Sequence, residues 1–140
     1  MPDAVVKPTV TTLEVDPHEL FCPSGIEIVP GARYRFEAQG KWKDGWIVCG
    51  PEGWPGLLLE AWNRLPWRRV FLLCASVGKD LRHAFPVGQG CEWTAPAEAA
   101  DWESRQLYFF ANDWPHMYGN NHALPPQQGG PLRVTVTRLP

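Results

Sequence analysis

A ten-residue stretch near the C-terminus, NDWPHMYGNN (112–121), carries the side chains of this chain best suited to metal chemistry. It contains one carboxylate and three carboxamides: Asp113, Asn112, Asn120 and Asn121. Calcium takes six to eight oxygen ligands from carboxylates, carboxamides, backbone carbonyls and water. If the Pro and Gly of the stretch turn the chain back on itself, Asp113, Asn120 and Asn121 can supply three of them. The stretch therefore predicts a calcium site of low charge and modest affinity.

The residues alone allow two other interpretations of the same stretch. Asp and Asn concentrate in reverse turns because their side chains hydrogen-bond the neighbouring backbone, so Gly-Asn-Asn also fits an ordinary turn. Asp113 with His116 and His122 is a donor set that zinc accepts, although a loop containing Pro115 does not hold both imidazoles on one face. The EF-hand pattern is absent, since Asp and Asn do not alternate along the stretch and no Glu closes it.

Length and charge narrow the class of protein. A chain of 140 residues is long enough to bury one core, which predicts a single domain over residues 1–140. Thirteen basic residues nearly cancel fifteen acidic ones, so no nucleic-acid partner is expected. The basic cluster WNRLPWRR, with Arg64, Arg68 and Arg69, is predicted to be a solvated surface.

Hydropathy gives an expectation about membranes and location. No apolar stretch approaches the ~20 residues of a membrane span, so membrane insertion is not expected. The sequence MPDAVVKPTV lacks the basic and then apolar order of a signal peptide. The expected location is the cytoplasm, or the outside of the cell after export without a recognisable signal peptide.

Short segments rich in β-branched and aromatic residues predict an all-β fold. Fifteen Pro and thirteen Gly residues interrupt helical periodicity. The predicted strands are TVTTLEV (9–15), IEIV (26–29), RYRFEA (33–38), VFLLCASV (70–77), QLYFFA (106–111) and LRVTVTRL (132–139). LLLEAWNRL (57–65) predicts a short helix ended by Pro66, and ALPPQQGGPL (123–132) predicts a loop. These elements fit a β-sandwich with long functional loops.

The strand patterns also predict which side chains are buried. In RYRFEA, Tyr34, Phe36 and Ala38 alternate with charged residues, as expected where one face of a sheet is wet. VFLLCASV is apolar on both sides, which favours a central strand with Cys74 as a buried thiol. The four cysteines are Cys22, Cys49, Cys74 and Cys91. They form no C-x-x-C pair, and the sequence leaves one disulfide among them open.

Eight tryptophans are a heavy load for this length. Trp93, in CEWTAP just before a turn, and Trp42, after the strand RYRFEA, are predicted to fill the core. Five others fall among Gly, Pro and charged residues, where partial exposure is expected: Trp46, Trp54, Trp62, Trp67 and Trp114. Exposed indole rings beside polar groups suit sugars, because a sugar offers both an apolar C–H face and hydroxyls. The same rings also suit a subunit interface.

The stretch 112–121 resembles the hallmark loop of the calcium-dependent galactophilic lectins of bacteria, the PA-I type, which reads Asn-Asp-x-Pro-x-x-Tyr-Gly-Asn-Asn. This chain has those residues with unbroken spacing: Asn112, Asp113, Pro115, Tyr118, Gly119, Asn120 and Asn121. VGKDLRHAFPVGQGCEWTAP (77–96) is similar to the family's stretch from an Ile-Gly through a Pro-Val and a Gly to a Trp-x-Ala-Pro. The resemblance covers residues 70–137 well and the first half weakly, through YRFEAQGKW.

The resemblance implies a small, jelly-roll-like β-sandwich that binds carbohydrate through calcium and is not an enzyme. The family holds calcium with the motif's Asp, both terminal Asn side chains and two backbone carbonyls. The implied ligands here are Asp113, Asn120, Asn121, the Met117 carbonyl and a carbonyl in KWKDGW, from Asp44 or alternatively Gly45. If Asp44 offered its carboxylate instead, the site would gain charge and affinity.

The resemblance also implies a galactoside partner, because two neighbouring galactose hydroxyls complete the calcium shell in the family. The implied sugar-binding residues are Asp113, Trp114, Asn120 and Asp44. Trp114 replaces a small aliphatic residue, and it either lines the pocket or blocks it. The family's His and Gln for the sugar's primary hydroxyl have no clear counterparts in PEGWPGLLLEAWNRLPWRR. Because single lectin sites are weak, a homo-oligomer is compatible with this function.

Two other classes of function stay as alternatives. A non-catalytic structural or interaction β-sandwich with a degenerate sugar site would bury its Trp-rich loops against a partner. A glycoside-acting enzyme would need paired carboxylates, which APAEAADWES offers as Glu98, Asp101 and Glu103 on a predicted solvated loop. The sequence lacks the common nucleophile-elbow, phosphate-loop and zinc-protease motifs, and a binding protein is predicted. His18 and His83 are predicted to be isolated.

Overall fold

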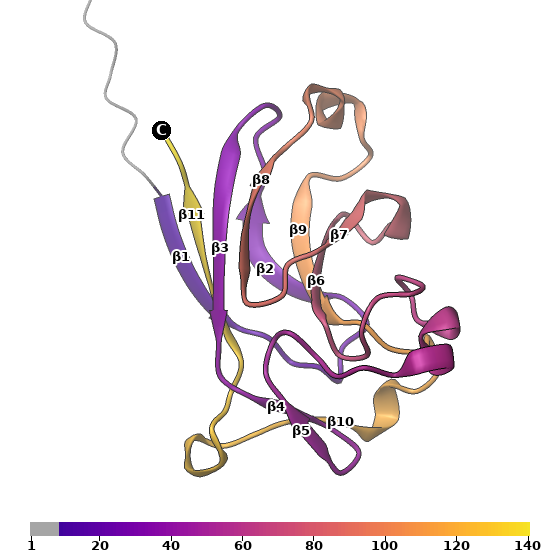
Figure 1. The fold of residues 1–140 in the computed structure, drawn as a ribbon. Helices are drawn as coiled ribbons and strands as arrows, with labels where there is room; N and C mark the ends of the chain where they lie inside the picture. The colour runs from indigo at the N-terminus through magenta and orange to yellow at the C-terminus, as the bar shows by residue number, and fades with distance from the viewer. Residues whose placement is uncertain (1–8) are drawn as a thin grey trace, which may run out of the picture.

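Three antiparallel sheets form the fold in a computed structural model that describes residues 9–140 (Figure 1). The first has the order β1-β11-β3-β8, with β1 Thr9–Glu14, β11 Arg133–Arg138, β3 Arg33–Gln39 and β8 Gly90–Thr94. The second has the order β2-β9-β6-β7, with β2 Cys22–Glu27, β9 Gln106–Ala111, β6 Leu73–Val77 and β7 Ala84–Pro86. The third has the order β10-β4-β5, with β10 Asn121–Ala123, β4 Trp42–Asp44 and β5 Ile47–Cys49.

The hydrophobic core lies between the inner faces of the first two sheets. Phe36 of β3 contacts Phe109 of β9 edge to face, with ring centroids 6.0 Å apart. Trp93 of β8 is half-buried and stacks on Phe85 of β7, with centroids 4.4 Å apart. The predicted all-β sandwich is thereby confirmed, with the third sheet lying at one end of it (Figure 1). Short 3-10 helices punctuate the connections: η1 Leu57–Trp62, η2 Leu81–His83, η3 Ala97–Asp101, η4 Tyr118–Asn120 and η5 Pro126–Gln128.

Most of the burial predictions are confirmed. Tyr34 and Phe36 face the core while their charged neighbours on β3 face solvent. All residues of β6 are buried, and this strand lies between β9 and β7 inside its sheet. Trp42 is fully buried, and its Nε1 donates to the Gly50 carbonyl at 3.1 Å. Cys74 is a buried thiol, and all four cysteines are free.

Several strand boundaries differ from the predictions. Strand β2 covers Cys22–Glu27 instead of 26–29, and its pairing with β9 is irregular between Pro23 and Glu27. Strand β6 begins at Leu73 instead of 70, because Phe71 adopts the left-handed φ of 63° that a strand does not accommodate. The predicted helix is the 3-10 helix η1, which ends at Trp62, before Pro66. The loop 123–132 contains the single turn η5.

Five strands were not predicted from the sequence: β4, β5, β7, β8 and β10. Four of them have three residues each, which is too short for a side-chain alternation to be recognised. Strand β10 lies at the end of the polar stretch 112–121 and includes Asn121. Its backbone is paired with β4 in the third sheet, so backbone pairing and not side-chain hydrophobicity makes it a strand.

The expectations about membranes and export can be placed on the structure only in part. Within residues 9–140, no helix has the length and apolar character that crossing a bilayer would require. The signal-peptide expectation rests chiefly on residues 1–8, which lie outside the described part of the chain.

The contact between the two large sheets can be tested at Phe36. Phe36→Ala should lower the free energy of unfolding by about 3–5 kcal/mol, because it removes a buried ring and leaves a cavity against Phe109. The matched control is Glu37→Ala, the next residue on β3, which faces solvent and should change stability by less than about 0.5 kcal/mol. Urea unfolding measures both, and equal effects would contradict the assigned inner face.

Candidate functional site

A pocket of about 160 Å³ opens beside η1 and η4 at the end of the sandwich that carries the third sheet. Its lining residues are Asp44, Trp54, Leu59, Val70, Asp113, Trp114, Met117 and Asn120. Asn121 follows Asn120 directly, and it pairs with Asp44 across β10 and β4. The structure therefore brings every predicted site residue to one place.

Asn112 fixes the chain at the entrance to the site. This fully buried residue follows β9, and its Oδ1 accepts a hydrogen bond from the Leu65 amide at 2.8 Å. Its Nδ2 donates to the carbonyls of Leu65 and Arg69, at 3.0 and 3.2 Å. One carboxamide therefore ties residues 65–69 to the end of β9, and Asp113 comes next in the chain.

Arg64 is the main correction to the sequence analysis, which predicted a solvated side chain. It is buried, and its guanidinium lies 4.4 Å from the Phe21 ring centroid and 4.1 Å from that of Phe110. It donates to the Leu20 carbonyl at 2.6 Å and to the Tyr118 hydroxyl at 2.9 Å, and Tyr118 in turn donates to the Ala111 carbonyl. Aromatic faces and hydrogen bonds replace the water that a buried cation loses. Arg68 and Arg69 are exposed, as predicted.

The third sheet holds the opposite side of the pocket. The Gly45 amide donates to the Asn120 carbonyl at 2.9 Å, which joins the β4–β5 turn to η4. Gly45 has a φ of 59°, a conformation that glycine adopts without strain. Asn121 is buried, and its Nδ2 donates to the Pro17 carbonyl at 3.1 Å. These bonds fix the two Asn residues against Asp44.

Asp113 is the most unusual group in the pocket. Its side chain is 6 % exposed, and Oδ1 accepts a hydrogen bond from the Trp114 amide at 2.8 Å. Its Oδ2 has no hydrogen-bond partner, and neither has Oδ1 of the neighbouring Asn121. Burial is the main cause that raises the pKa of Asp113 to about 6, with a further contribution from the negative charge of Asp44. By hydrogen-bond geometry neither of these two buried oxygens has a donor, and the nearby Asn121 side chain lowers the pKa of Asp113 only slightly against the effect of burial.

Asp44 places a second carboxylate on the pocket wall. Its Oδ2 accepts a hydrogen bond from Nε1 of Trp54 at 3.2 Å, while burial raises its pKa. Two carboxylates that lose hydration and repel each other gain most from a cation between them. Asp44 lines the pocket and its negative charge acts on Asp113, so this residue can offer a charged oxygen in addition to its backbone carbonyl.

The donor set consists of oxygens, which suits a hard cation. Within residues 9–140, no three His, Cys, Asp or Glu side chains gather into a metal site. The zinc set of Asp113, His116 and His122 is therefore not assembled. Calcium fits the available oxygens, since carboxylates, carboxamides and backbone carbonyls are its ordinary protein ligands.

Trp114 lines the pocket. Its Nε1 donates to the Leu59 carbonyl at 2.8 Å, and its ring meets that of Trp62 edge to face with centroids 5.7 Å apart. Trp54 and Trp114 are half-buried, whereas Trp46, Trp62 and Trp67 are exposed, as predicted for this group of five. The pocket thus has an indole wall fixed in place beside the Asp113 carboxylate.

The segment that walls the pocket carries an unusual backbone. Leu57, Trp67 and Phe71 have positive φ angles of 53°, 62° and 63°, which cost non-glycine residues energy. No local pattern predicted the walls that Leu59 and Val70 provide, since their roles depend on this backbone path. Trp54 and Trp114 were expected to be partly exposed, and both line the pocket.

Comparison with known proteins supports the fold. The chain is similar to a solved structure described as "EclA N-terminal domain; PllA-like lectin", with a TM-score of 0.64 and 22 % sequence identity. The similarity covers 92 % of this chain and 96 % of that one. No protein-family model and no curated protein sequence matches the chain. At this identity the likeness establishes a lectin-like fold.

The raised pKa of Asp113 predicts how the metal-free protein responds to pH. A carboxyl group whose pKa is higher in the folded than in the unfolded state favours folding when protonated, so its contribution is present below about pH 4 and is lost as pH rises through about 6. Asp113→Asn keeps the shape without the charge. In chelator at pH 7.5 it should raise the free energy of unfolding by about 1–2 kcal/mol, a value reduced for the water that reaches the pocket.

Urea unfolding of wild type and Asp113→Asn from pH 4 to 8 measures this difference. The gain of the variant should shrink toward zero near pH 4, where the wild-type carboxyl is protonated. A variant that is less stable than wild type at pH 7.5 would show that the carboxylate has donors in the metal-free protein.

The burial of Arg64 predicts that its substitution lowers stability more than substitution of the exposed Arg68 does. Arg64→Met should lower the free energy of unfolding by about 2–3 kcal/mol, because the Leu20 carbonyl loses its donor and three aromatic rings lose a cation. Arg68→Met, on the exposed neighbour, should change it by less than about 0.5 kcal/mol. Equal losses of unfolding free energy in the two variants, measured by urea unfolding, would contradict the burial and the contacts assigned to Arg64.

Proposed function

We propose that this chain is a calcium-dependent carbohydrate-binding protein whose leading ligand class is galactosides. The observation that carries the proposal is the pair of buried, unpartnered oxygens, Oδ2 of Asp113 and Oδ1 of Asn121, beside the carboxylate of Asp44. A buried polar oxygen without a donor is costly, and buried charges are normally paired or bound to a metal. A calcium ion would satisfy both oxygens.

The residues at the pocket fit such an ion. Asp113 and Asn121 offer the unpartnered oxygens, and the lining residues Asn120, Met117 and Asp44 would add a carboxamide, a backbone carbonyl and a carboxylate. When bound, calcium supplies open coordination positions for two neighbouring sugar hydroxyls. With two carboxylates near the ion, the site would hold calcium more tightly than one formed by Asp113 alone.

The chain's own residues support recognition of the sugar. Asn120 is exposed, so its carboxamide is free to hydrogen-bond a sugar hydroxyl, and Asp113 and Asp44 are acceptors beside it. Trp114 and Trp54 provide apolar surface for the C–H face of the ring. The similar solved structure is described as a lectin, which agrees with this class of ligand. Galactosides are proposed from the motif at residues 112–121.

An interaction module is the second candidate. Leu57 and Leu58 of η1 and Trp46 of the β4–β5 turn expose most of their side chains. Exposed apolar side chains of this size favour contact with another surface. A module of this kind would be indifferent to calcium and sugar, so the same experiment separates the two candidates.

Thermal unfolding of the purified protein in chelator, in calcium, and in calcium with galactose tests the proposal. A ligand that binds only the native state raises its stability by mass action, so calcium should raise the midpoint and galactose should raise it further. Asp113→Ala should abolish the calcium response while it leaves the fold intact. Glu37→Ala removes an exposed carboxylate far from the pocket wall and should keep the full response.

Each outcome has a definite meaning. A calcium response without a galactose response leaves the metal site standing and overturns the galactoside. No response to either ligand overturns calcium-dependent binding and favours the interaction module. A calcium response that persists in Asp113→Ala overturns the assigned ligand set.

A further inference from the structure

A second concavity lies away from the candidate site. It encloses about 690 Å³, and its lining includes Lys79, Asp101, Trp102, Glu103, Ser104 and Tyr108. Strand β9 runs from Gln106 to Ala111, so this groove adjoins its beginning while Asp113 follows its end. The two sites share no lining residue.

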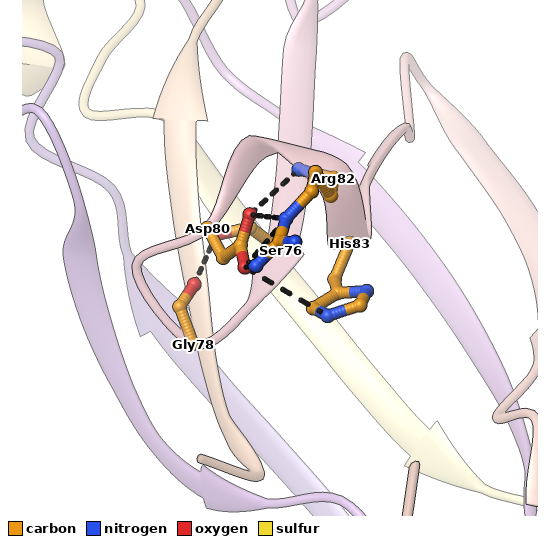
Figure 2. A network of polar contacts seen from close by, with 5 residues as sticks. All are labelled: Ser76, Gly78, Asp80, Arg82 and His83. Carbon is orange, nitrogen blue, oxygen red and sulfur yellow. Dashed lines mark hydrogen bonds and ion pairs between the residues drawn. The ribbon is translucent and has the colours of Figure 1, made fainter. Parts of the chain in front are cut away.

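Hydrogen bonds and ion pairs connect the residues along one wall of the groove (Figure 2). Asp80 caps η2 by accepting the Arg82 amide at 2.9 Å, and its two oxygens accept bonds from the Arg82 guanidinium at 2.8 to 3.2 Å. In the turn before it, the buried hydroxyl of Ser76 donates to the Gly78 carbonyl at 2.9 Å. These bonds connect the turn to the start of η2.

His83, in η2 after this turn, stacks on Trp102. The two rings stack with centroids 3.7 Å apart and 17° between their planes, and the imidazole lies 3.8 Å from Oδ2 of Asp80. The expectation that His83 is isolated was therefore wrong. The stack joins η2 to the segment after η3, far apart in sequence, and presents a half-buried aromatic surface to the groove.

Carboxylates flank this aromatic surface. Asp101 and Glu103 stand on either side of Trp102 in the chain, are exposed as the sequence predicted, and form no ion pair with any described residue. Ser104 accepts the Gln106 amide at 3.2 Å, which leaves its own hydroxyl proton free to be donated. Lys79 lies over the Tyr108 ring at 5.7 Å and adds a flexible cationic donor.

The chemistry of the groove selects a class of ligand. Lys79 and Arg82 nearly balance Asp80, Asp101 and Glu103, so the groove does not favour a strongly charged molecule. Free carboxylates accept hydroxyl protons, Ser104 and Lys79 donate, and the rings supply apolar surface. A neutral saccharide is recognised through hydrogen-bond acceptors, hydrogen-bond donors and apolar surface, and the groove offers each of them. Unlike the pocket at Asp113, the groove contains no buried oxygen without a partner, so its residues do not require a metal.

We propose that this groove is a second saccharide-binding site, independent of calcium and separate from the Asp113 pocket. The proposal stands on the groove's own residues and does not depend on the function proposed for that pocket. Two sugar sites at opposite ends of one sheet would let a single domain bridge two glycan chains. Such bridging raises avidity without an oligomer.

The eight indole N–H groups allow both sites to be read in one NMR experiment, with each signal assigned by single Trp→Phe variants. The probes are lactose, maltotriose and chitotriose, each titrated in chelator and then in calcium. We expect at least one probe to shift the Trp102 signal in chelator. The double variant Asp101→Asn with Glu103→Gln should weaken that binding at least about tenfold, because charge-assisted hydrogen bonds are lost.

The variants keep the test falsifiable. Both changes are isosteric and lie on exposed side chains, so the other indole signals should stay in place and verify the fold. Glu37→Gln, an exposed carboxylate on β3, is the matched control and should leave the titration unchanged. Unchanged affinity in the double variant would overturn the assigned residues.

The two reporters distinguish the two proposals. If no probe moves Trp102 while Trp114 responds to a sugar in calcium, the second site is overturned and the calcium-dependent site stands. If Trp102 responds in chelator and Trp114 never does, the second site stands and the first proposal fails. A Trp102 signal that responds to a lysine-rich peptide and to none of the three saccharides would identify a cation-binding groove and overturn the saccharide assignment.

Discussion

The Asp113 carboxylate is buried with fewer hydrogen-bond donors than an ionised carboxyl group requires, and the neighbouring loops are arranged around it. A carboxylate in this setting carries a desolvation cost, which appears as its raised pKa, and the Trp114 amide and the Asn121 side chain offset that cost only in part. Asp44 increases the cost by facing the same pocket. An arrangement that costs stability in the metal-free protein is expected at a site built for a ligand, because the ligand then gains what the chain lacks. The proposed calcium ion would supply the positive charge that the buried Asp113 carboxylate lacks.

The surrounding polar contacts are used to hold this costly group in position. Asn112 satisfies three backbone groups of the 65–69 segment, and Arg64 links Leu20, Tyr118 and the rings around it. Both are buried, so their bonds are not exchanged with water and their geometry is well defined. The rigid elements underneath are the strand β9 and the short third sheet. The site therefore sits on loops, but loops that are fixed at several points.

The tryptophans near the site divide into one that packs in the core, two that line the pocket and one that faces solvent. Trp42 fills the core next to Phe71, while Trp114 and Trp54 wall the pocket and Trp62 faces solvent beside them. At the other end of the second sheet, Trp102 stacks on His83 and lines the groove together with Asp101 and Glu103. One β-sandwich can carry two such sites because its connections gather at both ends of the strands, away from the packed faces.

From local patterns the sequence predicted the fold class, four strands nearly to the residue, and the oxygen donors of the candidate site, but not its Leu59 and Val70 walls. It could do so because side-chain alternation is local along a strand, and because the oxygen donors fall within the single stretch 112–121 or, like Asp44, were indicated by a motif. Three features became apparent only in the three-dimensional structure: Arg64 is buried, His83 stacks on Trp102, and Asn121 belongs to a strand. Each of these depends on contacts between segments distant in the chain: Arg64 with Phe21 and Phe110, Asn121 with Asp44. No local pattern encodes such a partner, since a polar side chain is buried or solvated according to what the fold brings against it.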